Sequence, residues 1–424
     1  MNWKSMAVFA LGIMLSACQP PQTGQTNTTP ANTIANTTAN NTTNTANTTV
    51  TDAAKKAAPT NLQELAERIV TQSAGVKEGD IVLISGGIRD MELLENIDIE
   101  VEKVGGHPLL TIGSERLAKR YYAEVPEKYD SQEPKLGMEL ARIANVTINV
   151  DNSETEGLLA DVPPARLAAN AKAGEPVGAE FLRRKVRSVD VGNGLYPTEW
   201  RAKRFEMSPG DFAKTFWEGV NIDYTNLQAI GDKAKTALVG KELEITHPNG
   251  TNLKMNIEGR SVYISDGIIS ADDVQKGNVN VYLPAGEAAI APAANSGDGK
   301  FIIEKQNFNG KEITNLTLTF AGGKLTEMTG EGAGFAALKA DYDARGAGKE
   351  LLGYVDFGIN PNLKLAPSSK YGNWVSAGMV TVGTGNNTWA GGTNNVSGGV
   401  TGHLVGATVK IDGKVIVENG VLKI

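Results

Sequence analysis

The sequence has very few of the side chains on which common hydrolytic sites depend. It contains one cysteine and three histidines among 424 residues. A single cysteine cannot form an intramolecular disulfide, and three histidines leave little choice of base for a Ser-His-Asp triad. The chain also contains neither a Gly-x-Ser-x-Gly nor a His-Glu-x-x-His motif. These absences argue against a serine or cysteine hydrolase and against a zinc protease built on that helix motif.

The chain also lacks a basic cluster and a long apolar run. Its 41 Lys and Arg are outnumbered by 48 Asp and Glu, which gives a formal net charge of −7. Phosphate binding requires concentrated positive charge, so nucleic acid is not expected as a partner. The N-terminal apolar run, Met6–Leu15, is too short to span a bilayer, and no later segment is long and apolar enough to do so.

The N-terminus has the pattern of an export signal. Lys4 precedes the apolar run, and Leu15-Ser16-Ala17-Cys18 follows it with small residues before the only cysteine. This pattern resembles the bacterial lipoprotein box, which implies a signal peptide over residues 1–17 and acylation of Cys18. We therefore expect a cell-envelope protein that is anchored to a membrane by its lipid. Gln19 is not the Asp that would suggest retention at the inner membrane, so the outer membrane is the predicted location, with the leaflet left open.

Residues 18–60 consist largely of Asn, Thr, Ala and Pro, with repeated Asn-Thr-Thr units. Such a segment has almost no apolar surface to bury, so it cannot offset the entropy lost on ordering. We predict a disordered tether with an r.m.s. span of roughly 35 Å.

The next part of the chain, residues 61–200, alternates between helical and strand patterns. Strands are predicted at 81–84, 107–112 and 146–150, and helices at about 61–70, 90–104 and 136–144. These are βαβ units, so the predicted fold is an α/β domain with a mostly parallel sheet.

The remaining part, residues 201–424, is predicted to be a β-rich α+β domain. Two helices are expected between Ser208 and about Val239, and the period then changes to that of strands. Turn signals at Asn249-Gly250, Gly310, Gly322 and Asp412-Gly413 predict hairpins, and residues 335–352 are expected to be partly helical. A strand over residues 278–282 should end at Pro284 and Gly286 and place Glu287 at a strand end.

Several motifs from Tyr196 onwards carry a family resemblance. In chain order they are Tyr196-Pro197-Thr198, Gly250-Thr251-Asn252-Leu253, Gly259-Arg260, Asp266-Gly267, Leu283-Pro284-Ala285-Gly286-Glu287, Ala291-Pro292 and Phe357-Gly358-Ile359-Asn360-Pro361. Their order resembles that of the thermophilic metallo-aminopeptidases of the aminopeptidase T and S type, from about Asn61 to the end of the chain. The resemblance implies two domains with a cleft between them, hydrolysis of N-terminal residues from peptides, and two divalent metal ions. It also implies a homodimer, for which the sequence shows no interface.

The metal ligands implied by the resemblance are only partly present. Glu287 is retained, Asp356 stands where the family has Glu, and His403 is retained. Three other ligand positions carry residues that coordinate poorly or not at all: Trp374, Thr381 and Val405. A two-metal site is therefore not expected. At most one ion, zinc, cobalt or manganese, is expected on Glu287, Asp356 and His403.

Two functional hypotheses follow from this mixed ligand set. In the first, the protein still removes N-terminal residues through an altered metal site. In the second, it has lost catalysis and binds peptides or another small molecule. The ligand losses favour the second hypothesis, and the resemblance favours the first. For His403 an ordinary half-buried role remains an equal alternative, and for Trp374 and Trp389 simple core packing does.

Overall fold

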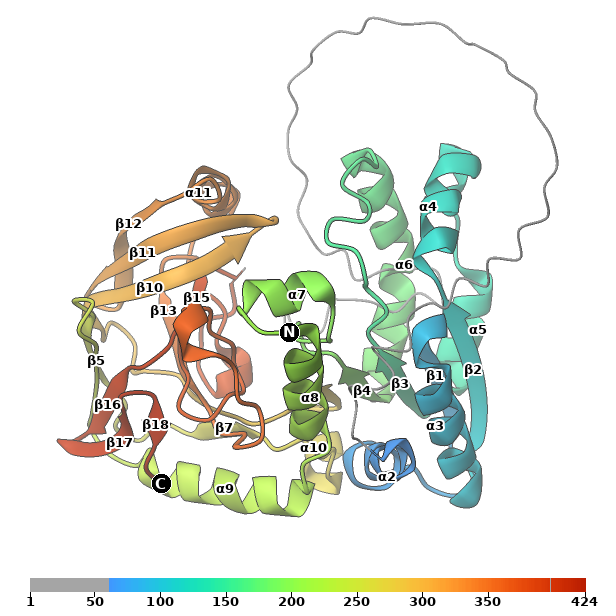
Figure 1. Cartoon of the computed structure of the whole chain (residues 1–424), viewed down its shortest axis with the longest axis horizontal. Coiled ribbons are helices and arrows are strands. Elements are labelled where there is room, and N and C mark those ends of the chain that lie inside the picture. The colour runs from blue at the N-terminus through green and yellow to red at the C-terminus, as the bar shows by residue number, and fades with distance from the viewer. Residues whose placement is uncertain (1–60, 397) are drawn as a thin grey trace, which may run out of the picture.

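The computed structural model describes residues 61–396 and 398–424. The predicted signal peptide, Cys18 and the predicted tether lie outside the described residues. Within those ranges, every helix is too short or too polar to cross a bilayer. Figure 1 shows an α/β part and a β-rich part side by side, with α7 and α8 between them.

The α/β part is built on a five-stranded sheet, sheet A, in which every strand pair is parallel. The strand order is β2-β1-β3-β4-β8. The bounds are β1 Ile81–Gly87, β2 His107–Gly113, β3 Val146–Val150, β4 Arg187–Val191 and β8 Asn280–Leu283. The helices of this part are α2 Leu62–Arg68, α3 Met91–Lys103, α4 Glu115–Glu124, α5 Lys135–Ile143 and α6 Pro164–Arg184. The predicted mostly parallel sheet is confirmed.

Helices cover both faces of sheet A. α2 and α3 belong to the same buried cluster as Val82 and Ile148 on one face. On the opposite face, α5 and α6 form a smaller cluster against Leu83. Local signals fix the start of α2, because the Asn61 side chain accepts hydrogen bonds from two backbone N–H groups of its first turn.

The chain crosses more than once between the two parts. After α7 Glu199–Arg204, α8 Pro209–Val220 and α9 Tyr224–Ala237 it enters the β-rich part, and α10 Ala271–Lys276 then follows β7 and precedes β8 in the chain. It then returns, because β8 pairs with β4 as the fifth strand of sheet A. The sequence analysis assigned all residues after 200 to the second domain, and β8 is where the structure differs from that assignment.

The β-rich part contains two antiparallel sheets. Sheet B has eight strands in the order β12-β11-β10-β6-β5-β16-β17-β18, and sheet C has five in the order β15-β14-β13-β9-β7. The strands of sheet B are β5 Glu242–Thr246, β6 Asn252–Asn256, β10 Asp298–Phe308, β11 Lys311–Ala321, β12 Lys324–Glu331, β16 Thr408–Ile411, β17 Lys414–Glu418 and β18 Val421–Leu422. Those of sheet C are β7 Val262–Ser265, β9 Glu287–Ile290, β13 Leu352–Gly358, β14 Val380–Thr384 and β15 Thr401–Leu404, with α11 Phe335–Ala344 between β12 and β13.

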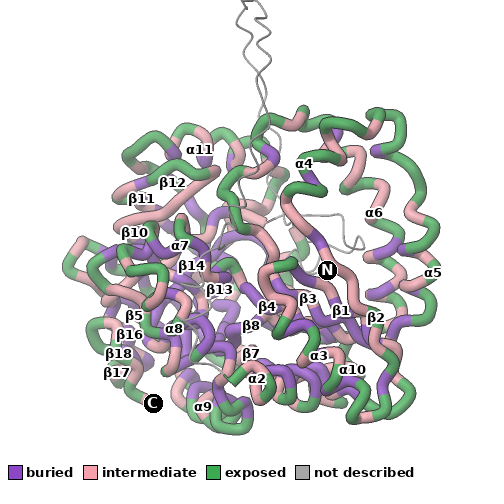
Figure 2. Tube along the Cα trace, turned by 45° about the vertical axis from the view of Figure 1, so that its right-hand side comes forward, coloured by how far each residue is buried: buried purple, intermediate pink, exposed green. Residues whose placement is uncertain are grey.

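Short helical turns complete the described elements. They are the π-helical η2 Ile69–Ser73 and the 3-10 turns η3 Ile88–Asp90, η4 Glu127–Tyr129, η5 Pro367–Ser369 and η6 Thr388–Ala390. The hairpins expected at Asn249-Gly250, Gly310, Gly322 and Asp412-Gly413 are all present as adjacent antiparallel pairs. In Figure 2 the buried positions follow the strands, whereas the outer sides of α5 and α6 are largely exposed.

Candidate functional site

Three of the residues singled out from the sequence lie in one line across sheet C. Asp356 on β13 is directly opposite Thr381 on β14, and Thr381 is directly opposite His403 on β15. Residues that pair directly across strands project from the same face of a sheet. We call the face that carries Asp356, Thr381 and His403 the site face. Asp356 and Thr381 are completely buried there, and His403 is partly buried.

Glu287 belongs to the same face. It lies two residues before Ala289, which pairs with Asp356, and side chains two apart in a strand share a face. Glu287 is nearly fully buried, with 5% of its surface exposed. The sequence placed this acid at the end of the preceding strand, but it is the first residue of β9.

The turn before Glu287 is fixed by a close backbone approach. Gly286 has φ +127°, and a Cβ atom there would lie 2.7 Å from the Cβ of Asn360. Asn360 is completely buried and donates its side-chain N–H groups to the carbonyl oxygens of Ala285 at 2.7 Å and Gly219 at 3.0 Å. These contacts hold the chain as it passes from β8 in sheet A to β9 in sheet C.

His403 is held by residues that replace expected metal ligands. The hydroxyl Oγ1 of Thr381 lies 2.8 Å from the ring nitrogen Nδ1 of His403, a hydrogen bond whose direction follows the tautomer of the ring. The indole of Trp374 contacts the same imidazole edge to face, with ring centroids 4.5 Å apart. Val405 follows directly after β15. The imidazole is therefore positioned by a hydroxyl and an indole.

The donor set on the site face does not fit the metal centre that the family resemblance implies. Among the described residues, no three or more His, Cys, Asp or Glu side chains are gathered closely enough to hold an ion. Divalent transition metals require imidazole, thiolate or carboxylate ligands, which a buried threonine hydroxyl and an indole do not replace. Glu287, Asp356 and His403 thus share a face without forming a ligand group, and their role as ligands stays a prediction.

Aromatic side chains occupy the rest of the site face. Tyr263 on β7 pairs with Ala289, and Tyr354 lies two residues before Asp356 on β13. Trp389, from the loop between β14 and β15, contacts both rings, with centroids 5.5 Å from Tyr263 and 4.9 Å from Tyr354. Sequence reasoning named Trp389 but missed the two tyrosines. The alternation Tyr354, Asp356, Gly358 was the signal that placed Tyr354 on the same face as Asp356.

The site face is connected to sheet A through Tyr282 on β8. Burial raises the pKa of the Tyr282 hydroxyl, and the charges of Asp190, Tyr263 and Glu287 raise it further. Tyr282 is thus close to residues of both sheets. In sheet A, Tyr282 lies directly opposite Asp190 of β4.

Asp190 is the centre of a polar row across sheet A. Its carboxylate accepts a hydrogen bond from Asn149 Nδ2 at 3.0 Å and one from Ser188 Oγ at 3.3 Å, and Ser85 Oγ donates to Asn149 Oδ1 at 2.6 Å. Burial raises the pKa of Asp190 to about 6, because the two hydrogen bonds compensate only in part and Asp151 adds negative charge. Parallel strands usually carry apolar residues on both faces, so this row is an exception that the sequence analysis did not identify.

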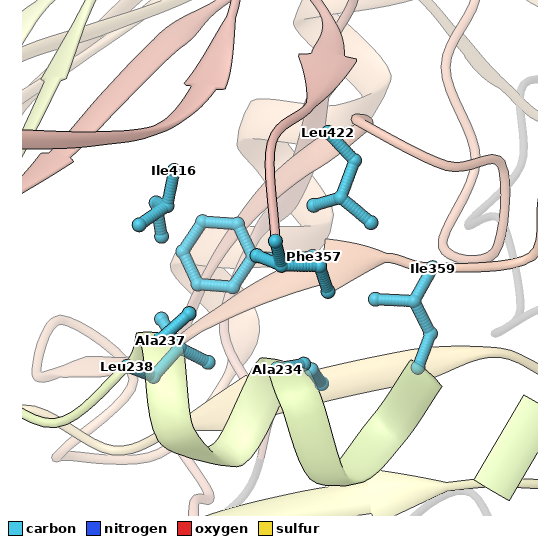
Figure 3. A pocket seen from close by; sticks show the side chains of 9 residues that line it. Ala234, Ala237, Leu238, Phe357, Ile359, Ile416 and Leu422 are labelled. Atoms are coloured by element: carbon cyan, nitrogen blue, oxygen red, sulfur yellow. The ribbon is translucent and has the colours of Figure 1, made fainter. Parts of the chain in front are cut away.

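The opposite face of sheet C is apolar. Ala288 and Phe357 project from it towards α9, where they line a small cavity of about 10 Å³. Figure 3 shows Ala234 and Ala237 of α9, Leu238 directly after it, and Ile416 and Leu422 around the cavity. A cavity this small and without polar partners holds no water. It is a packing defect behind the site face and offers no ligand site.

Comparison with known proteins places this fold among metalloproteases. A family model described as thermophilic metalloprotease (M29) matches residues 58–348. The match includes Glu287 and ends before β13, so Asp356, Thr381 and His403 lie beyond it. A search of curated proteins found no match.

Two solved structures have similar folds. Wild-type AmpT from Thermus thermophilus superposes with a TM-score of 0.63 at 16% identity, over 86% of this chain and 99% of that one. The 2,5-dihydroxypyridine dioxygenase from Pseudomonas putida KT2440 superposes with a TM-score of 0.51 at 11% identity, over 85% of this chain and 96% of that one. At these identities the likeness shows the fold alone.

Proposed function

Because the chain belongs to the thermophilic metalloprotease (M29) family, we propose that it is a lipid-anchored envelope member of that family which binds peptides without cleaving them. Family membership suggests metal-dependent peptide hydrolysis. The observation that carries the proposed loss of catalysis is the contact between Thr381 Oγ1 and His403 Nδ1 at 2.8 Å. Thr381 stands at the position where the family resemblance implies a second imidazole ligand.

Two further observations support this proposal. The described residues contain no gathered group of metal-ligating side chains. Trp374 packs against His403, so an indole occupies space beside the imidazole. Both observations concern the chemistry of the site, and together they favour binding over hydrolysis.

A second candidate function is hydrolysis with a single ion on Glu287, Asp356 and His403. The observation in its favour is that the three residues project from the same face of sheet C. Two carboxylates and one imidazole are a workable ligand set for a catalytic ion that keeps an open position. When bound, such an ion would polarise a carbonyl group and activate a water molecule.

The decisive experiment measures bound metal on the full-length protein in detergent. The protein is purified without chelator, incubated with zinc, cobalt or manganese, and subjected to elemental analysis. We expect no stoichiometric metal in the wild type and no hydrolysis of aminoacyl reporter substrates. Near-stoichiometric metal that His403→Ala removes, together with hydrolysis lost in Glu287→Ala, would refute the proposal in favour of the single-ion hydrolase.

A second experiment restores the ligands that the family resemblance implies and asks whether metal binding appears. The triple variant Trp374→Glu, Thr381→His, Val405→Asp restores ligands at all three altered positions. We expect it to bind metal where the wild type does not, since it adds two carboxylates and an imidazole to the three residues retained. A folded triple variant without metal affinity would show that the retained residues are not at ligand positions.

The proposed anchor is tested separately. We propose that Cys18 carries the lipid and that the outer membrane holds the protein. Wild-type protein should incorporate labelled fatty acid and sediment with membranes, and Cys18→Ser should do neither. Equal labelling of both proteins would contradict the assignment of Cys18, whereas inner-membrane fractionation would contradict only the location.

A further inference from the structure

Trp389 lies on the site face although its backbone belongs to a loop. It is the central residue of η6, in the connection between β14 and β15. Its indole contacts Tyr263 at 90° and Tyr354 at 70° between ring planes, the edge-to-face geometry that aromatic pairs prefer. The side chain is only partly buried. An indole from a surface loop therefore fills a position walled by two tyrosines from the sheet.

Small residues of the sheet lie beneath and beside the rings that contact Trp389. Ala289 and Ala291 are completely buried beneath the aromatic cluster that contains Trp389. Tyr354 lies across Gly383, where a Cβ atom would come within 2.3 Å of the tyrosine ring. Any larger side chain at these positions would displace the rings. We call the space that the indole fills, above Ala289 and Ala291 and between Tyr263 and Tyr354, the recess.

The loop is fixed by contacts that do not involve the indole. The Asn387 side chain donates to Gly353 O at 2.9 Å and accepts from Asn394 N at 2.8 Å. Arg260 donates to Gly391 O at 2.9 Å. Because these hydrogen bonds hold the backbone on either side of Trp389, the loop keeps its attachment when the indole changes rotamer.

The recess lies next to the altered metal site. Ala289 on its floor is directly opposite Asp356, and adjacent strands are about 4.8 Å apart. A ring in the recess is therefore one strand away from Asp356 and on the same face as His403. A peptide side chain bound here would bring its own backbone alongside the carboxylates and the imidazole of the site face.

We propose that this recess is a binding subsite for an aromatic side chain of a peptide ligand, and that Trp389 is its internal occupant in the ligand-free protein. The proposal rests on the proposed peptide-binding function and adds the ligand class to it. A Trp, Phe or Tyr side chain of the ligand takes the place of the indole, which rotates outwards about its side-chain bonds while the loop backbone keeps its hydrogen bonds. The ligand therefore competes with Trp389.

The test uses full-length protein in detergent and the variants Trp389→Ala and Trp389→Leu. The probes are indole and the peptides Trp-Ala-Ala and Ala-Ala-Ala, measured by titration calorimetry and thermal unfolding. We expect indole to raise the midpoint of thermal unfolding of Trp389→Ala but not of wild type. Trp-Ala-Ala should bind Trp389→Ala about tenfold more tightly than wild type, with no such gain for Ala-Ala-Ala.

Two further variants make the test specific. Trp200→Ala removes another partly buried tryptophan, whose ring on α7 is contacted by the guanidinium groups of Arg201 and Arg204, and should gain no indole binding. Adding Ala289→Leu to Trp389→Ala fills the floor of the recess and should abolish the indole effect.

Every outcome decides the matter. If Trp389→Ala and Trp389→Leu fold and neither binds indole, or if neither folds, Trp389 is an ordinary core residue and the inference is wrong. Peptide binding that is unchanged by Trp389→Ala also refutes the inference while leaving the proposed function intact. Indole binding without any peptide binding would show only that Trp389→Ala opens an apolar cavity, and it refutes both the inference and the proposed function.

Discussion

Asp190 makes the stability of the protein depend on pH in a way that one substitution should remove. Its folded-state pKa is about 6, compared with 3.8 for an ordinary aspartate. The folded protein therefore binds this proton more tightly than the unfolded chain does. The sign follows: the carboxyl costs no stability below pH 3.8, and its cost grows as the pH rises through the folded-state pKa.

The magnitude follows from the shift. About two pKa units at 1.36 kcal/mol each give a cost of about 3 kcal/mol above pH 7, as an upper limit because Asp190 is partly exposed. By the same linkage, roughly half of this cost is already present at pH 5. Asp190→Asn removes the charge and keeps an oxygen that accepts the Asn149 hydrogen bond.

The assay is urea unfolding of wild type and Asp190→Asn at pH 5 and pH 8. We expect the variant to be more stable at both values, and its advantage to grow by up to about 1.5 kcal/mol between them. Asp161→Asn, at an exposed position, is the control and should show no such growth. An advantage that is equal at the two pH values, or a destabilised variant at pH 8, would refute the reasoning.

Three further predictions concern the site and its support, all measured by urea unfolding at pH 7. Thr381→Val should cost about 1–3 kcal/mol, because the ring of His403 loses its 2.8 Å partner in a buried setting; an unchanged midpoint would contradict this. Asn360→Ala should cost at least as much, since two buried carbonyl groups lose their donor. Gly286→Ala should also destabilise the fold, because φ is +127° and the added Cβ meets Asn360; tolerance of alanine would show that the turn adjusts freely.

Local chemistry made much of the fold predictable. The Asn-Gly and Asp-Gly turns specify hairpins through residues that adopt positive φ, and β5–β6 and β16–β17 form at those places. The strand at 146–150 was predictable from the alternation of apolar and polar residues in Val-Thr-Ile-Asn-Val. In these cases the signal is contained in a few neighbouring residues, so no long-range contact is needed to decide the structure.

Other elements depend on contacts that the sequence pattern does not encode. α6 includes Pro176 within 21 residues and was not predicted, because proline normally interrupts a helix. The placement of β8 beside β4 is a pairing between segments about 90 residues apart. Neither a helix stabilised by packing nor a distant parallel pair can be derived from local periodicity.

The candidate site shows the same division. The family resemblance supplied Glu287, Asp356 and His403, and the strand register places all three on one face. It could not supply Tyr263 or the recess beneath Trp389, because these depend on which strands become neighbours. The polar row around Asp190 was missed for the same reason.

Positions at which the family resemblance implies metal ligands are linked to one another through His403. Trp374 packs on its ring and Thr381 binds its Nδ1, so the residues at two of these positions contact the residue at a third. Changing one of them back therefore has two opposing effects: a ligand is gained, and a contact that orients the imidazole is lost. Thr381→His alone should for this reason destabilise the protein without restoring metal binding, whereas the triple reversion replaces the lost contacts by coordination. Tight metal binding by Thr381→His alone would contradict this. It would show that the imidazole of His403 is already oriented towards an ion in the wild type.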